Sequence, residues 1–158
     1  FMQAGDLLIS LRNIHTIAVL DPDREIIKWA SAGKWRFQHD PDFLDNGNLL
    51  ICDNLGHRGP GGPLRIIEIS PLTKKVNWQY AGNADELLIS QGRSSQQRLP
   101  NGNTLITESE NGRIFEVTRD KEIVWEFYNH NRGGDKNQLV GILNWGVRVD
   151  PGTLEFLD

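Results

Sequence analysis

A histidine lies beside two acidic residues in a stretch that otherwise has the composition of strands and turns. His39 follows Gln38 and precedes Asp40-Pro41-Asp42. An imidazole near neutral pH is a good nucleophile, a general base or, when protonated, an anion ligand. His39 is therefore the candidate catalytic residue. The alternative is a structural histidine whose ring is hydrogen-bonded by Asp40 or Asp42.

Four further residues are candidates for binding an anionic substrate. Arg12 and Arg98 flank apolar strand residues, and a guanidinium offers paired donors to a sulfate or phosphate group. Asn54 and Arg58 lie in the glycine-containing stretch 53–59, where backbone N–H groups can turn inward around an anion. The alternatives are solvated surface arginines and a flexible loop between strands.

The acidic residues around His39 do not have the spacing of a calcium-binding loop. Asp40, Asp42, Asp45 and Asn46 do not alternate ahead of a glycine as EF-hand ligands do, so we interpret them as turn residues. Cys52 is the single cysteine, which excludes an intrachain disulfide and a multi-cysteine metal site. We expect neither a bound metal nor a cofactor.

Short apolar runs separated by turn residues must position these candidates, because helical periodicity is almost absent. Three Gly-x-Leu-Ile-like runs predict strands, and two of them follow Asn-Gly pairs that favour tight hairpin turns. A second apolar run follows each, and then a third run that contains a tryptophan. The first runs begin at Gly5, Gly47 and Gly102, and the tryptophans are Trp29, Trp78 and Trp125.

Successive tryptophans lie 49 and 47 residues apart, which is typical of the blades of a β-propeller. We therefore predict an all-β fold of about three four-stranded antiparallel blades, half of a six-bladed propeller. The whole chain, 1–158, is then a single partial β-propeller domain. Its units are expected at about 5–34, 35–91 and 92–128, followed by a terminal strand segment at 129–158.

The innermost strands of the second and third units are predicted at Trp35–Leu44 and Arg93–Leu99, and the first unit lacks one. Gly141–Val149 has the composition of a strand with no blade after it. Three blades cannot close a ring, and an open arc exposes sheet faces and strand edges. We expect either further blades in a longer chain, or a head-to-tail homodimer in which Gly141–Val149 supplies the missing inner strand of a six-bladed ring.

The bulk composition excludes two classes of partner. The net charge of −4 is spread along the 158 residues without a basic stripe, so nucleic acid is not an expected partner. No apolar run approaches the roughly 20 residues of a membrane span, so no membrane partner is expected. A small anionic molecule is the remaining ligand class that the candidate residues favour.

Several of these motifs, in this order, resemble the arylsulfotransferase family, specifically its second, largely uncharacterised branch. The more specific part is Gln38-His39-Asp40-Pro41 followed by Asn46-Gly47-Asn48 and Asp53-Asn54. The similarity continues through nearly the whole chain, in Ser10-Leu11-Arg12-Asn13, Gln97-Arg98-Leu99-Pro100-Asn101-Gly102-Asn103 and Asn111-Gly112-Arg113-Ile114-Phe115-Glu116-Val117.

The resemblance implies a six-bladed propeller that transfers a sulfuryl group from an aryl sulfate to a phenolic acceptor. In characterised members a channel histidine takes the group transiently, and other histidines, an asparagine and an arginine hold the sulfate oxygens. His39 falls in the matching Gln-His motif, as either the covalent or a sulfate-binding histidine, and Asn54 with Arg58 falls in the stretch after it. Characterised members are periplasmic, so the resemblance implies a periplasmic or extracellular location.

The sequence also departs from the family pattern. Ser94 takes the place of His39 in the third unit, and the blades that would carry a further channel histidine are not in this sequence. Two other functions therefore stay open. One is a non-catalytic propeller module that binds a ligand or acts as a scaffold, and the other is an inactive half-propeller that needs a partner chain.

Overall fold

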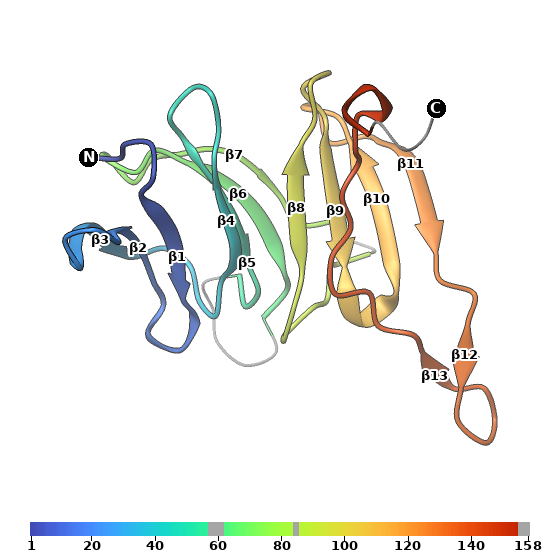
Figure 1. The fold of residues 1–158 in the computed structure, drawn as a ribbon. Coiled ribbons are helices and arrows are strands. Elements are labelled where there is room, and N and C mark those ends of the chain that lie inside the picture. Colours follow the sequence, from blue (N-terminus) through green and yellow to red (C-terminus); the bar gives the residue numbers. More distant parts are fainter. Residues whose placement is uncertain (57–61, 84–85, 155–158) are drawn as a thin grey trace.

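The computed structural model describes residues 1–56, 62–83 and 86–154. Nearly all of the regular structure in these ranges is β, in three larger antiparallel sheets and one short hairpin (Figure 1). Three short 3₁₀ helices are η1 (Arg12–Ile14), η2 (Ser109–Asn111) and η3 (Pro151–Thr153). The prediction of an all-β fold built from propeller blades is confirmed.

The three larger sheets are called blades 1, 2 and 3, in chain order. Blade 1 consists of β1 (Leu7–Leu11), β2 (Thr16–Asp21) and β3 (Ile26–Ala32). Blade 2 consists of β4 (His39–Phe43), β5 (Leu49–Asp53), β6 (Arg65–Ile69) and β7 (Val76–Tyr80). Blade 3 consists of β8 (Ser95–Arg98), β9 (Thr104–Glu108), β10 (Arg113–Val117) and β11 (Ile123–Tyr128). In each blade, neighbouring strands are consecutive in the sequence.

The two Asn-Gly pairs form the turns β4–β5 and β8–β9, as predicted. Gly47 and Gly102 have φ angles of +78° and +86°, a region that residues with a Cβ atom rarely adopt. The amide of Leu44 donates to the carbonyl oxygen of Asn48, and the amide of Leu99 donates to that of Asn103, both at 2.9 Å. These turns fix the register of the two innermost strands.

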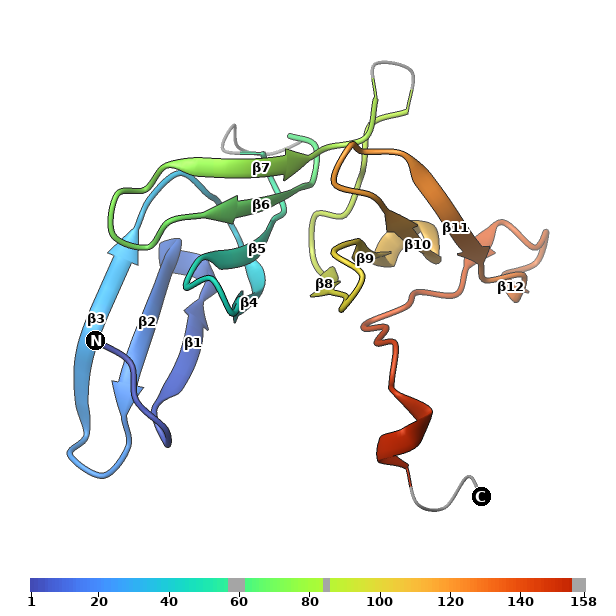
Figure 2. The ribbon, with the colours of Figure 1, turned by 90° about the horizontal axis from the view of Figure 1, so that it is seen from above.

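The blades stand side by side in an arc when seen from above (Figure 2). β4 and β8 lie on the concave side of the arc, and β7 and β11 lie on the convex side. Blade 1 has three strands, and β1 follows Gly5 as β5 follows Gly47. In the described ranges, blade 1 therefore lacks the counterpart of β4 and β8, as predicted. The unit boundaries stay a prediction, although β1–β3, β4–β7 and β8–β11 each fall within one unit.

Each junction between blades holds a buried apolar core. The core between blades 1 and 2 contains Ile17, Trp35, Leu49, Ile51, Ile67 and Ile69. The core between blades 2 and 3 contains Leu50, Cys52, Leu64, Ile66, Trp78, Tyr80, Leu88, Ile106, Phe115 and Val117. Because side chains alternate along a strand, both faces of blade 2 are apolar and buried, and every residue of β5 is buried.

The three tryptophans do not pack alike. Trp78 is 7% exposed in the second core, whereas Trp125 on β11 is 44% exposed, because within the described residues no further sheet covers that face of blade 3. A β-bulge lies between the pairs Glu68–Trp78 and Ile69–Val76. The bulge sends Val76 to the first core and Trp78 to the second, although regular alternation along a strand would place both on one face.

The C-terminal part differs from the sequence-based expectation. It begins with a short hairpin of β12 (Arg132–Gly133) and β13 (Leu139–Val140). The prediction of a strand at Gly141–Val149 is wrong for the single chain, because the segment has no strand beside it to pair with. It runs across blade 3 instead (Figure 1), and its backbone bonds to side chains such as Gln97.

Candidate functional site

His39 is held at the start of the innermost strand of blade 2 by an unusual backbone. The residues on either side of Gln38-His39 are Phe37 and Asp40, whose φ angles of 52° and 49° lie in the left-handed region. The register of β4 against β5 shifts between His39 and Asp42. Asp40 is fixed by the amide of Gln96 on β8, which donates to Asp40 Oδ2 at 2.8 Å. Such strained backbone persists only where the surroundings hold it.

A single hydrogen bond determines which ring nitrogen of His39 carries the lone pair that can accept a proton or attack a substrate. His39 Nδ1 lies 2.8 Å from Oδ1 of Asn54. Asn54 is completely buried, and its Nδ2 donates to the carbonyl oxygens of Ser90 at 2.7 Å and Arg93 at 2.6 Å. Since carbonyl oxygens only accept, the amide nitrogen must face them and the amide oxygen must face the ring.

The orientation of Asn54 therefore places the hydrogen of a neutral His39 ring on Nδ1. Nδ1–H donates to Asn54, and the lone pair is left on Nε2. Among the described residues, no group hydrogen-bonds His39 Nε2. The arrangement can present Nε2 as a nucleophile or base, and it can hold the ring in place if the ring becomes positively charged.

Ser94, the residue that takes the place of His39 in blade 3, belongs to the same cluster. Its hydroxyl oxygen accepts a hydrogen bond of 3.1 Å from Asn54 Nδ2. Cys52 lies opposite His39 in the β4–β5 ladder, and burial raises the pKa of its thiol well above the usual value. Cys52 is therefore a protonated core residue at neutral pH and not a second nucleophile.

Arg12 lies near the His39 end of the blades. Its guanidinium stacks over the ring of Phe37 at 4.4 Å from the ring centre, and Nη2 donates to the carbonyl oxygen of Gln91 at 3.2 Å. Phe37 precedes His39 by two residues, and Gln91 lies in the segment whose carbonyl groups hold Asn54. The side chain is half-buried, and no carboxylate is paired with it among the described residues.

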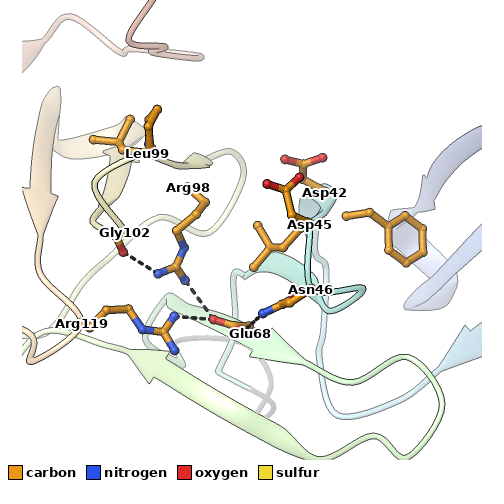
Figure 3. Close-up of a pocket in the computed structure, with 11 residues that line it drawn as sticks. Asp42, Asp45, Asn46, Glu68, Arg98, Leu99, Gly102 and Arg119 are labelled. Carbon is orange, nitrogen blue, oxygen red and sulfur yellow. Dashed lines mark hydrogen bonds and ion pairs between the residues drawn. The ribbon is translucent and has the colours of Figure 1, made fainter.

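Arg98 lies at the opposite end of β8 from Ser94, about 13 Å away along the strand. Its Nη2 pairs with Glu68 at 3.1 Å, and its Nη1 donates to the carbonyl oxygen of Gly102. Figure 3 shows Arg98 and Arg119 converging on the same Glu68 carboxylate, beside Asp42 and Asp45. They line a cavity of about 560 Å³. Its acidic lining and paired arginines do not favour an anion, and burial raises the pKa of Asp42.

Two of the predicted residues meet in one cluster, one lies near it and one does not. His39 and Asn54 are in contact, Arg12 is at the same end, and Arg98 is at the other. Arg58 lies outside the described residues. The roles of all five stay predictions.

Sequence reasoning did not find the contribution of Ser90, Arg93 and Ser94. Two of the three act through backbone carbonyl groups, which residue type does not reveal. Their segment is attached to η2, because the amides of Gln91 and Gly92 donate to the carboxylate of Glu110. The sequence feature that could have indicated this contribution is the Gly-Arg-Ser-Ser run that leads into β8, because its Ser94 corresponds to His39.

Neither a metal site nor a membrane-spanning helix is found in the described parts of the chain. No group of three or more His, Cys, Asp or Glu residues there has the geometry to hold a metal ion. No helix in those ranges is both long and apolar enough to cross a membrane.

The fold and the histidine cluster define a partial β-propeller with an imidazole on an innermost strand. The family model described as arylsulfotransferase (ASST) matches residues 1–130. The chain therefore belongs to the arylsulfotransferase family, and sulfuryl transfer is the activity associated with that family. No functionally curated protein has significant similarity to it.

Two solved structures with TM-scores of 0.50 or more support the fold. A protein of unknown function from Bacteroides caccae has a TM-score of 0.53 and 16% identity, over 79% of this chain and 42% of that one. Virginiamycin B lyase from Staphylococcus aureus has a TM-score of 0.50 and 19% identity, over 78% of this chain and 38% of that one. BamB from Moraxella catarrhalis has a TM-score of 0.48 and 18% identity, over 87% and 39% of the two chains. The chain thus spans about two fifths of the length of each.

Proposed function

We propose that the protein transfers a sulfuryl group from an aryl sulfate to a phenolic acceptor, with His39 as the nucleophile. The observation that carries the proposal is the hydrogen bond from His39 Nδ1 to the buried, oriented amide of Asn54. It leaves the Nε2 lone pair available. Membership of the arylsulfotransferase family supports the same reaction.

In the first step the lone pair on Nε2 forms a bond to the sulfur atom of the donor. The bond between sulfur and the aryl oxygen breaks, and its electron pair leaves with the phenolate. The imidazole ring then carries a positive charge, and the Nδ1–H bond to Asn54 Oδ1 becomes charge-assisted and stronger. Asn54 thus stabilises the intermediate by positioning and polarisation, which differs from its predicted role as a sulfate ligand.

In the second step the oxygen of the acceptor phenol attacks the sulfur atom. The N–S bond breaks, its electron pair returns to Nε2, and the phenolic proton passes to solvent. Splitting the transfer into two displacements lowers each barrier. Arg12 is the proposed sulfate ligand in the described ranges, because its guanidinium lies at the His39 end without a paired carboxylate. Arg98 is not used, since its charge is paired with Glu68.

The test is the transfer of sulfate from 4-nitrophenyl sulfate to phenol, with both nitrophenolate and phenyl sulfate measured. The variant His39→Ala should lose activity by at least about 1,000-fold, as removal of a covalent nucleophile does in other enzymes. The variant His130→Ala is a matched control, because His130 is an exposed histidine after β11. Unchanged turnover by His39→Ala would refute the proposed role of His39.

A second readout separates a covalent nucleophile from a sulfate-binding histidine. Wild-type protein quenched under alkaline conditions during turnover should carry one added SO₃ group on the peptide that contains His39. If the group is found on another residue, His39 is not the nucleophile.

A further inference from the structure

The C-terminal segment 141–149 is attached to blade 3 in the way that β8 is attached to blade 2. Arg98 on β8 pairs with Glu68 at 3.1 Å and lies 5.1 Å from the ring centre of Trp78. Arg148 pairs with Glu116 at 2.9 Å and lies 5.3 Å from the ring centre of Trp125. Glu68 faces Trp78 in its sheet as Glu116 faces Trp125. Arg148 therefore lies against blade 3 in the place where Arg98, from the innermost strand β8, lies against blade 2.

The asparagines around the two glutamates repeat as well. Asn46 and Asn48 donate to Oε1 of Glu68 at 3.1 and 2.9 Å. Asn101 and Asn103 donate to Oε1 of Glu116 at 3.1 and 2.7 Å. Each glutamate is thus held by the Asn-Gly turn of its own blade and by an arginine from the segment at the innermost position beyond that blade, which is β8 for Glu68 and residues 141–149 for Glu116. We call this arrangement the junction clamp.

Hydrogen bonds between side chains and backbone groups independently support the same placement of segment 141–149. Between β4 and β8, Asp40 Oδ2 accepts from the amide of Gln96, and Gln96 Nε2 donates to the carbonyl oxygen of Asp40. Between β8 and the terminal segment, Gln97 Oε1 accepts from the amide of Arg148, and Gln97 Nε2 donates to the carbonyl oxygen of Arg148. The segment is held beside β8 as one innermost strand beside another.

Within the described residues, no other strands of a fourth blade accompany this segment. The face of blade 3 beyond the segment is apolar and open, with Trp125 44% and Phe127 43% exposed. A groove of about 360 Å³ lies between this face and residues 146–149. The described residues thus contain a segment in the place of an inner strand, beside an apolar surface, without the strands that would cover them.

Blade 1 has the complementary deficiency. It contains three strands, and among the described residues β1 has a hydrogen-bonded neighbour on one edge only. On the side away from blade 2 it exposes Leu7 by 49% and Ile27 by 52%. In the described residues, one end of the arc therefore has three strands without an inner strand, and the other end has a segment in the place of an inner strand without the three further strands of a blade.

We propose that residues 141–149 of one copy form the innermost strand of blade 1 of a second copy, so that two chains close a six-bladed ring. The register follows from the glycine turn of blade 3, where Arg98 lies four residues before Gly102 and Thr104 lies two residues after it. Arg148 likewise lies four residues before Gly152, and Leu7 lies two residues after Gly5. Because Arg98 pairs with Thr104 and Gln97 with Leu105, Arg148 lies opposite Leu7 of the second copy, and Val147 lies opposite its Leu8.

The first test is the mass of the 158-residue chain in solution by light scattering. Twice the 17.9 kDa mass of one chain is expected. The variant Arg148→Glu, which places two carboxylates together at the clamp, should weaken the dimer at least about tenfold. Arg132→Glu, on the exposed β12, is the control and should leave the mass unchanged. A monomer, a larger assembly, or a dimer insensitive to Arg148→Glu overturns the proposal.

The second test fixes the register and does not depend on the charge reversal. The double variant Leu8→Cys, Val147→Cys should form a disulfide-linked dimer on oxidation, since residues paired across two strands are within bonding distance. The pair Leu8→Cys, Ile142→Cys is the control, because residue 142 lies five residues from the paired position. A dimer that cross-links equally through the control pair, or through neither pair, overturns the strand exchange.

Discussion

At the scale of single residues, the proposed chemistry depends on Asn54, an asparagine that solvent does not reach. Asn54 donates to two backbone carbonyl groups and accepts from His39, so its amide has one stable orientation. His39 is fixed a second time by its backbone, which lies beside the left-handed Asp40. A histidine held at both ring and backbone would need little rearrangement when its charge changes in the proposed reaction.

Replacing Asn54 by alanine should cost about 1–3 kcal/mol of the free energy of unfolding, because the carbonyl groups of Ser90 and Arg93 lose their buried donor. It should also free the His39 ring to exchange its hydrogen between Nδ1 and Nε2. Chemical denaturation and ¹⁵N NMR of the imidazole measure the two effects. Asn77→Ala, at an exposed position of β7, is the control. An unchanged tautomer in Asn54→Ala would show that Asn54 does not select it.

The sequence alone could predict the candidate His39 and the nearby Asn54, because their residue types are chemically conspicuous in a strand-rich chain. It could not predict that Asn54 lies behind the histidine, since the carbonyl groups that orient it come from residues 90–93, far away in the sequence. Arg98 is a candidate by residue type, but its pairing with Glu68 depends on how two blades meet. Such pairings follow from tertiary structure and not from spacing.

At the scale of elements, the junctions between blades use two different solutions at equivalent positions. Between blades 2 and 3 the junction clamp joins Glu68, Arg98 and Trp78. Between blades 1 and 2 an aromatic cluster replaces it, in which Phe1 stacks on Trp29 at 5.1 Å and lies 6.0 Å from Phe43. Because the aromatic side chains replace both members of the charged pair, the junction between blades 1 and 2 is filled and the replacement leaves no buried charge unpaired.

The junction clamp makes part of the stability depend on pH. Burial alone would raise the pKa of Glu68, but hydrogen bonds from Arg119, Asn48 and Asn46 outweigh it, and the pKa lies below its usual value. A carboxyl group with a lower pKa in the folded chain stabilises the fold above its unfolded pKa. That contribution is lost as the pH falls through the folded pKa.

The variant Glu68→Gln should therefore lower the free energy of unfolding by about 1–3 kcal/mol near neutral pH. The difference from wild type should shrink as the pH falls below about 5 and then through the lowered folded pKa of Glu68, because wild-type Glu68 then becomes neutral as well. Denaturant titrations across this range measure it, with Glu122→Gln on the exposed β10–β11 turn as control. A difference that does not change with pH would mean that the charge of Glu68 is not what stabilises the junction.

At the scale of the whole molecule, the described chain is an arc of blades with different surfaces at its two ends (Figure 2). The Asn-Gly turns and the tryptophan spacing predict the blades, because each signal is local to one unit. The bulges in β7 and β11 could not be predicted, and they decide which face a side chain joins. The predicted strand at Gly141–Val149 also fails in the single chain, since a strand requires a neighbour.

If the ring forms, thermal stability should depend on protein concentration. Dimerisation stabilises only the folded state, so the Tm should rise by a few degrees over about a hundredfold increase in concentration. Differential scanning fluorimetry measures it, and the variant Arg148→Glu should show a weaker dependence. A Tm that is independent of concentration in the wild type would argue for a folded monomer.

The burial of Cys52 has a practical consequence. It is the single thiol of the chain, it is fully buried in the core between blades 2 and 3, and a raised pKa keeps it protonated. A water-borne alkylating reagent can reach it only when these two blades separate. The rate at which Cys52 is alkylated thus reports how often the junction between blades 2 and 3 opens, and no engineered reporter is needed to measure it.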